Sequence, residues 1–264
     1  MKAHAQRSIG RLVGIMVIIV VAGILVARSY YGNLNQSVDP RIQPARELYE
    51  RYDKAAVSGD YYRIFKLLDT ISAIYQKIPH YRESFELGVL HNNRAAAFLT
   101  MALYPDSIPA SRNPFYELSP DSLASLAKQQ VKTAIAIYEG WNKRFQGKEG
   151  AKIRLEIQKE FLTGLVQSTS EMNDKYLNTR VKEIENSLVE NDRRLSVCYT
   201  NLGLVYRLQE EYPEAVAQYE KALELWDRNL DAENNLNKLL GRPPRKRNII
   251  QKLFPPSKEL STKK

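Results

Sequence analysis

Small and large apolar residues recur at helical spacing through residues 199–226. One face of a first helix carries them at spacings of three, one and three: Tyr199, Leu202, Gly203 and Tyr206. After a turn, a second helix that starts at Pro213 carries them at spacings of four, three and four: Ala215, Tyr219, Ala222 and Trp226. The minimal side chains at Gly203 and Ala215 allow the two helices to cross closely. Such a hairpin cannot bury both apolar faces alone, so it must stack on neighbouring hairpins.

This pattern resembles the tetratricopeptide repeat, a helical hairpin that stacks into a solenoid. The family pattern is aromatic-x2-Leu-Gly-x2-Tyr followed by Ala-x3-Phe, and residues 196–229 match it with Tyr in the place of Phe. The chain departs from the pattern at Asp227, which stands near the position of the family's closing proline. The resemblance implies that seven residues pack the repeat: Tyr199, Leu202, Gly203, Tyr206, Ala215, Tyr219 and Ala222.

Other segments resemble the repeat more weakly. These are the turn and second helix at 58–68, a first helix at 92–99, a second helix at 127–141 and a repeat opening at 229–236. Tyr61 and Tyr212 start comparable helices but lie 212 − 61 = 151 residues apart, which is not a multiple of the 34-residue period. We therefore predict an irregular solenoid of tetratricopeptide-like hairpins over residues 45–240.

Helical periodicity continues almost without interruption through this domain. The predicted helices span residues 45–57, 60–77, 81–103, 120–145, 149–170, 173–190, 193–208, 213–227 and 230–240. The interruption is a loop at 104–120 with four prolines, whose final Ser-Pro is a good helix start. No window alternates with a period of two, so we predict an all-α fold.

An apolar run precedes the domain. Residues 12–27 contain no polar side chain over 16 residues, and with flanking residues a helix of about 20 residues reaches roughly 30 Å, the thickness of a hydrocarbon core. We expect a single transmembrane helix at 9–28, with a linker at 29–44. The alternatives are a buried core helix and a cleaved signal peptide, although cleavage after Ala27 would place Leu25 where a small residue is preferred.

The charges around this run predict its orientation. Lys2, Arg7 and Arg11 precede it, whereas Arg28 and Arg41 are the basic residues in the stretch that follows. The positive-inside rule then places a short N-terminus, residues 1–8, in the cytoplasm and the C-terminal domain across the membrane. In a bacterium, the protein would lie in the inner membrane with a periplasmic domain.

The net charge of +9 is concentrated at the two ends of the chain. Residues 1–28 contribute +4 and residues 241–264 contribute +7, so the body between them sums to 9 − 4 − 7 = −2. A nearly neutral body argues against nucleic acid as a partner. The basic tail, residues 242–264, is suited to anionic lipid or an acidic partner, and its segment "NIIQKLF" to a membrane or a groove. A solubilising tail is the alternative.

No motif for catalysis, a cofactor or a metal is present in the sequence. The three histidines, His4, His80 and His91, have no second ligand at metal-binding spacing. The single cysteine, Cys198, lies at core spacing and is expected to be a buried, inert thiol. We therefore expect a protein without enzymatic activity.

The resemblance implies a binding groove on the first helix of the repeat. Its lining would be Val197, Thr200, Asn201, Leu204, Arg207 and Leu208. Asn93 and Asn201 correspond to residues that hold a peptide carboxylate in some family members, but the accompanying cations are not recognisable. We predict a membrane-anchored scaffold or chaperone-like adaptor for protein partners in the cell envelope. The alternative is an accessory subunit that regulates an envelope enzyme or binds cell-wall glycan, which an exposed aromatic cluster around Trp141 would favour.

Overall fold

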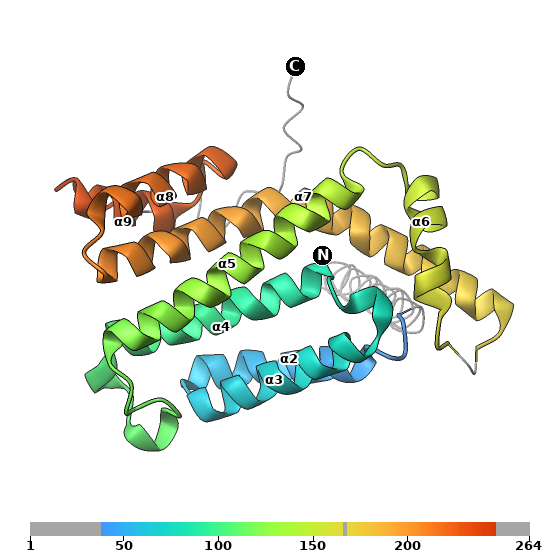
Figure 1. Cartoon of the computed structure of the whole chain (residues 1–264), viewed down its shortest axis with the longest axis horizontal. Helices are drawn as coiled ribbons and strands as arrows, with labels where there is room; N and C mark the ends of the chain where they lie inside the picture. The colour runs from blue at the N-terminus through green and yellow to red at the C-terminus, as the bar shows by residue number, and fades with distance from the viewer. Residues whose placement is uncertain (1–37, 166–167, 247–264) are drawn as a thin grey trace, which may run out of the picture.

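The computed structural model describes residues 38–165 and 168–246, and within these ranges the chain is all-α, as predicted. Its eight packed α-helices are α2 (Gln43–Ser58), α3 (Tyr61–Lys77), α4 (Phe85–Leu103), α5 (Pro120–Phe145), α6 (Gly150–Leu162), α7 (Ser170–Leu208), α8 (Tyr212–Leu225) and α9 (Leu230–Leu239) (Figure 1). The predicted transmembrane helix at 9–28 lies outside the described residues. None of the described helices is both long and apolar enough to cross a membrane.

Three helical hairpins form the body of the domain. The helix pairs α2–α3, α4–α5 and α7–α8 make extensive contacts within each hairpin, and the hairpins stack through α3 on α4 and α5 on α7 (Figure 1). Helix α9 packs on α8 at the C-terminal end, while α6 lies against the N-terminal half of α7. This order places α7 at the centre of the C-terminal half of the domain.

Helix α7 differs from the prediction. Two helices, 173–190 and 193–208, were expected, but the structure has one continuous helix of 39 residues. The predicted gap at residues 191–192 falls in the polar sequence Glu-Asn-Asp-Arg, which contains neither Gly nor Pro, and Asn191 is fully buried within the helix. Helix α6, in contrast, ends earlier than the predicted 170, because the chain turns at Gly164 with a φ of +86°.

Four of the helices begin at a short polar residue whose side chain caps the first turn. The side chains of Asp60, Ser119, Thr169 and Asn229 each accept a hydrogen bond from a backbone N–H in the first turn of α3, α5, α7 and α9 respectively. The Ser119–Pro120 start of α5 was predicted from the sequence. The chain therefore enters these four helices at defined positions, which sets the relative placement of the hairpins.

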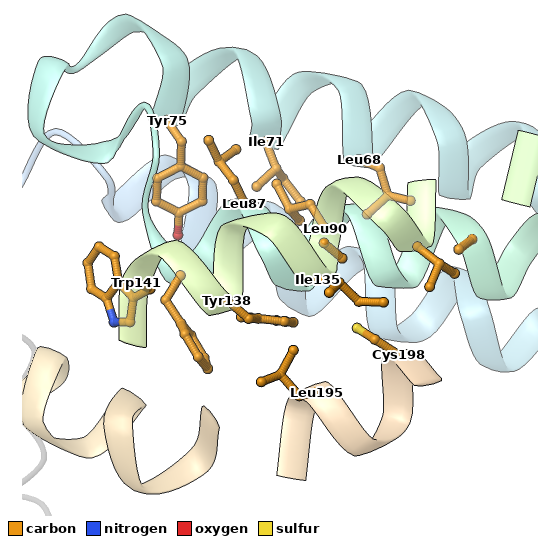
Figure 2. Close-up of a cluster of buried hydrophobic side chains, with 14 of the residues drawn as sticks. Leu68, Ile71, Tyr75, Leu87, Leu90, Ile135, Tyr138, Trp141, Leu195 and Cys198 are labelled. Atoms are coloured by element: carbon orange, nitrogen blue, oxygen red, sulfur yellow. The ribbon is translucent and has the colours of Figure 1, made fainter. Parts of the chain in front are cut away.

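One apolar core joins α3, α4, α5 and α7. Figure 2 shows side chains from these helices directed toward one another: Leu68, Ile71, Tyr75, Leu87, Leu90, Ile135, Tyr138, Trp141, Leu195 and Cys198. The thiol of Cys198 is buried and lies 3.3 Å from Oδ1 of Asn92, and burial raises its pKa. The expectation of a buried cysteine is thus met, and Cys198 is a core residue.

Candidate functional site

A cavity of about 320 Å³ lies between the end of α4, the last turns of α7 and the start of α9. We call it the α7–α9 groove. Its lining consists of Leu103, Tyr104, Val197, Thr200, Asn201, Leu204, Arg207, Asn229, Asp231 and Asn235. Five of the six residues predicted from the sequence are among them. Leu208, the sixth, is outside this lining and packs partly buried against the core.

The close packing of α8 covers one face of α7, and the groove lies on another face. A Cβ atom on Gly203 would lie 2.5 Å from Cε1 of Tyr219, so the helices approach at this point as closely as a glycine allows. Ala215, Tyr219 and Ala222 are fully buried on α8, and Tyr199 and Leu202 are nearly so on α7. Tyr206 is half-buried, with Nζ of Lys128 4.2 Å from its ring centroid. The opposite face of α7 is left to line the groove.

A buried polar network forms the floor of the groove. Nδ2 of Asn229 donates to Oγ of Ser196 at 2.7 Å and to Oγ1 of Thr200 at 2.9 Å, while its Oδ1 caps α9. Ser196 in turn donates to the carbonyl oxygen of Ala222 on α8 at 2.6 Å. These bonds fix α9 against the repeat. Asn229 was not among the predicted groove residues, although an asparagine directly before a helical pattern is a recognisable cap.

Asn93 and Asn201, which correspond to carboxylate-binding residues in some family members, both make hydrogen bonds inside the protein. Nδ2 of Asn201 donates to Oδ1 of Asn92 at 2.9 Å, and Nδ2 of Asn93 donates to the hydroxyl of Tyr49 at 2.7 Å. Asn201 lines the groove, whereas Asn93 is not part of its lining. The structure therefore does not bring the two together as one carboxylate site. They link α4 to α7 and α2 to α4.

The remaining lining divides into an apolar and a polar side. Leu103, Val197 and Leu204 are half-buried, and Tyr104 at the rim is 58% exposed. On the polar side, Nη1 of Arg207 donates to Oδ1 of Asn235 at 2.9 Å. The carboxylate of Asp231 has no ion-pair partner among the described residues. Such a mixture suits a peptide, with side chains on the apolar wall and polar groups facing the amides and charges.

A second cluster, missed at the sequence level, surrounds the buried side chain of Arg180. Its Nη1 and Nη2 donate to Glu86 at 2.5 and 3.2 Å, and its Nε donates to Nε2 of His80 at 3.0 Å. The guanidinium carbon also lies 4.5 Å from the ring centroid of Tyr81. From the sequence, His80 was only a histidine without a second ligand at metal-binding spacing; in the structure it is 3% exposed. Spacing could not reveal this cluster, since its members come from segments far apart in sequence.

The environment of the Arg180 cluster keeps its histidine neutral and its carboxylate charged. Burial, together with the charge of Arg180, lowers the pKa of His80 to about 2. Burial alone would raise the pKa of Glu86, but the charge and hydrogen bonds of Arg180 outweigh it and hold that pKa at about 2. The cluster ties α4 and α7 together and gives the histidine no free role as a base.

Comparison with known proteins identifies one segment. Residues 196–229 match the tetratricopeptide repeat family model. The search of curated proteins and the search of solved structures gave no match. The chain therefore contains a tetratricopeptide repeat, built from the C-terminal part of α7, from α8 and from the turn that follows. Such a repeat indicates a role in protein–protein interaction, with protein partners.

Proposed function

We propose that the protein is a non-catalytic adaptor, anchored in the inner membrane by residues 9–28, that binds a segment of a partner protein in the α7–α9 groove. The observation that carries this proposal is the position of Val197, Asn201 and Leu204. They belong to the tetratricopeptide repeat, face away from its packing side, and line one cavity. The apolar run at 12–27 and the charges beside it support the anchor and an extracytoplasmic domain.

The size of the groove favours a peptide or a single helix as the bound species. A volume of about 320 Å³ is at the lower end of the range of about 300–1,000 Å³ for ligand pockets. It accommodates a few side chains of a linear segment, with the exposed ring of Tyr104 available to pack beside them. This corresponds to recognition of a helix or extended peptide in a groove.

An exposed aromatic cluster around Trp141 would have favoured glycan binding, but the structure buries this residue. Trp141 is 3% exposed, and its Nε1 donates to Oγ of Ser187 at 2.8 Å. Its ring packs against Phe145 with centroids 4.7 Å apart. Because this aromatic cluster is part of the core, it offers no platform for a sugar ring, and we retain the adaptor role alone.

The test compares partner capture by two variants of the full chain. Leu204→Asp places a charge on the apolar wall of the groove, whereas Leu155→Asp places the same charge on α6, where the native leucine is 75% exposed. After cross-linking in intact cells, quantitative mass spectrometry should show a partner that Leu155→Asp retains and Leu204→Asp loses at least tenfold. Capture that is equal in both variants, with equal melting temperatures, would refute binding in the groove.

A further inference from the structure

The chain beyond α9 turns back along that helix. Gly241, with a φ of +66°, ends α9, and the N–H of Arg242 donates to the carbonyl oxygen of Asn237 at 2.8 Å. Arg245 is then held at its backbone, because its N–H donates to Oδ1 of Asn234 at 2.7 Å and its carbonyl oxygen accepts from Nδ2 of the same side chain at 3.1 Å. Nη1 of Arg245 also donates to both carboxylate oxygens of Glu233, at 3.0 and 3.2 Å. The chain is therefore fixed beside the middle of α9.

This attachment point is close to the α7–α9 groove. Asn234, which holds Arg245, directly precedes Asn235 of the groove lining, and consecutive Cα atoms are about 3.8 Å apart. The two residues project about 100° apart around α9, so the attachment point lies on the face of the helix next to the groove. Residues 246–249 span up to about 14 Å when extended, which exceeds the width of about 10–12 Å of a helix with its side chains. The residues that follow can reach the groove without any change in the domain.

The sequence that follows Arg245 complements the groove. Residues 247–254, "RNIIQKLF", carry their apolar side chains at spacings of one, three and one, which is one face of a helix: Ile249, Ile250, Leu253 and Phe254. The same segment includes the cations of Arg247 and Lys252. The groove offers an apolar wall and the carboxylate of Asp231, which has no ion-pair partner among the described residues. The apolar face of the segment therefore matches the apolar wall, and one of its cations can pair with Asp231, while Arg207 of the lining donates to Oδ1 of Asn235.

We propose that residues 247–254 bind in the α7–α9 groove of their own chain and occupy it until a protein partner displaces them. The inference rests on the proposed function of the groove as the partner-binding site. Because Arg245 is attached to α9, the segment is present at the groove at an effective concentration in the millimolar range. Even a weak intrinsic affinity then keeps the groove occupied, and a partner must bind more tightly than the segment to enter.

The experiment measures whether the attached segment competes with a free copy of itself. The probe is a fluorescently labelled synthetic peptide of residues 247–256, added to the full chain in neutral-lipid nanodiscs and to the same chain ending at Lys246. Fluorescence anisotropy should show binding to the shortened chain, and at least tenfold weaker binding to the intact chain. The double substitution Ile250→Asp and Leu253→Asp in the intact chain should restore peptide binding to the level of the shortened chain.

A second pair of variants locates the peptide. In the shortened chain, Tyr104→Asp changes a groove residue that is 58% exposed, so the fold is preserved, and it should weaken peptide binding at least tenfold. Leu155→Asp on α6 is the matched control and should leave binding unchanged. Equal peptide binding to intact and shortened chains overturns the inference. So does binding that Tyr104→Asp does not alter, which would place the peptide elsewhere, including on the lipid.

The outcomes separate this inference from the proposed function. If the peptide fails to bind the shortened chain while capture of a cellular partner still requires Leu204, the adaptor role stands and the inference is wrong. If the peptide binds at the groove but partner capture is indifferent to Leu204→Asp, the proposed function is wrong and the groove serves its own chain only. Equal melting temperatures of the intact and shortened chains show that removal of the tail leaves the domain folded.

Discussion

Two glycines occupy equivalent places in two different hairpins. A Cβ atom on Gly203 of α7 would lie 2.5 Å from the ring of Tyr219 on α8, and one on Gly88 of α4 would lie 2.7 Å from the ring of Tyr138 on α5. In each case the first helix of a hairpin lies directly on a tyrosine ring of the second. Both rings are fully buried, so neither can move aside without displacing its neighbours.

We therefore expect Gly88→Ala and Gly203→Ala each to lower the free energy of unfolding by about 1–3 kcal/mol, because an added methyl group overpacks a closed interface. Gly140→Ala on α5 is the matched control. A Cβ there meets nothing within 4 Å, and the better helix propensity of alanine should raise stability by up to about 1 kcal/mol. Urea unfolding followed by circular dichroism measures all three. Wild-type stability of Gly203→Ala would show that the helices do not cross at this residue.

The buried histidine makes stability depend on pH. The pKa of His80 is about 2 in the folded protein and about 6.5 in the unfolded chain, so the unfolded state takes up a proton first as the pH falls. Stability is complete above pH 6.5 and declines below it, by about 2 kcal/mol between pH 7.5 and pH 5. Glu86, with pKa values of about 2 and 4.5, contributes only below this window.

The variant His80→Gln isolates this contribution. Glutamine accepts the hydrogen bond from Nε of Arg180 but does not titrate, so the loss of unfolding free energy from pH 7.5 to pH 5 should be less than half that of the wild type. Denaturant unfolding at the two pH values provides the measurement. The same decline in both proteins would contradict a neutral buried His80.

At the scale of elements, the continuity of α7 is the feature that joins two parts of the domain. Its N-terminal half contacts α6, where Arg154 pairs with Asp174 at 2.7 Å, and its C-terminal half is the first helix of the tetratricopeptide repeat. A proline within the helix removes a backbone hydrogen bond and clashes with the preceding turn. The exposed residue Asp192 tests the junction of the two halves without disturbing the core.

Asp192→Pro should lower the free energy of unfolding by about 3 kcal/mol or more. Glu171→Pro is the matched control, because the N–H groups of the first helical turn have no acceptor within the helix, and it should cost far less. Thermal unfolding and amide hydrogen exchange across α7 distinguish the two. If Asp192→Pro were as stable as Glu171→Pro, α7 would consist of two independent helices as the sequence pattern suggested.

The predicted helix ends are accurate where a capping residue or a proline marks them, as at Ser119 and Pro120. They are wrong within α7, where a gap was predicted in a polar stretch without Gly or Pro. The sequence pattern identified the second hairpin as a weaker form of the repeat, at 92–99 and 127–141, but not the register that places Gly88 against Tyr138. Leu87-Gly88 and Ala134-x3-Tyr138 reproduce the spacing of Leu202-Gly203 and Ala215-x3-Tyr219, but the loop at 104–120 separates them. Only the α7 side of the groove was predicted, because the pattern of one helix identifies its own faces and not the helices that pack against them. Tyr104 at the end of α4 and Asn229 at the start of α9 belong to those neighbouring helices.

At the scale of the whole molecule, the position relative to the membrane is the open prediction. If residues 9–28 form the anchor, a reporter enzyme active only in the cytoplasm should give no activity when fused after Lys264, since the positive charges before the span retain the N-terminus inside. The measurement is the activity of the fusions in intact cells. The positive control carries the reporter directly after Ser8, with the rest of the chain removed. Moving Arg7 and Arg11 behind the span should raise reporter activity, and strong activity of the parent fusion would reverse the orientation.

Helix α7 also has a mechanical consequence. Its 39 residues extend about 58 Å at 1.5 Å per residue. About a third of the way along it, Glu183 pairs with Arg46 in the first turn of α2, close to where the described chain begins. Leu204, near the C-terminal end of α7, lines the groove 204 − 183 = 21 residues further on, a distance of about 32 Å. In the proposed adaptor, a partner in the groove and the start of the domain would therefore be connected through one continuous helix, whose backbone hydrogen bonds lie parallel to its axis. If residues 9–28 form the anchor, this rigid connection would keep a bound partner at a fixed distance from the start of the domain.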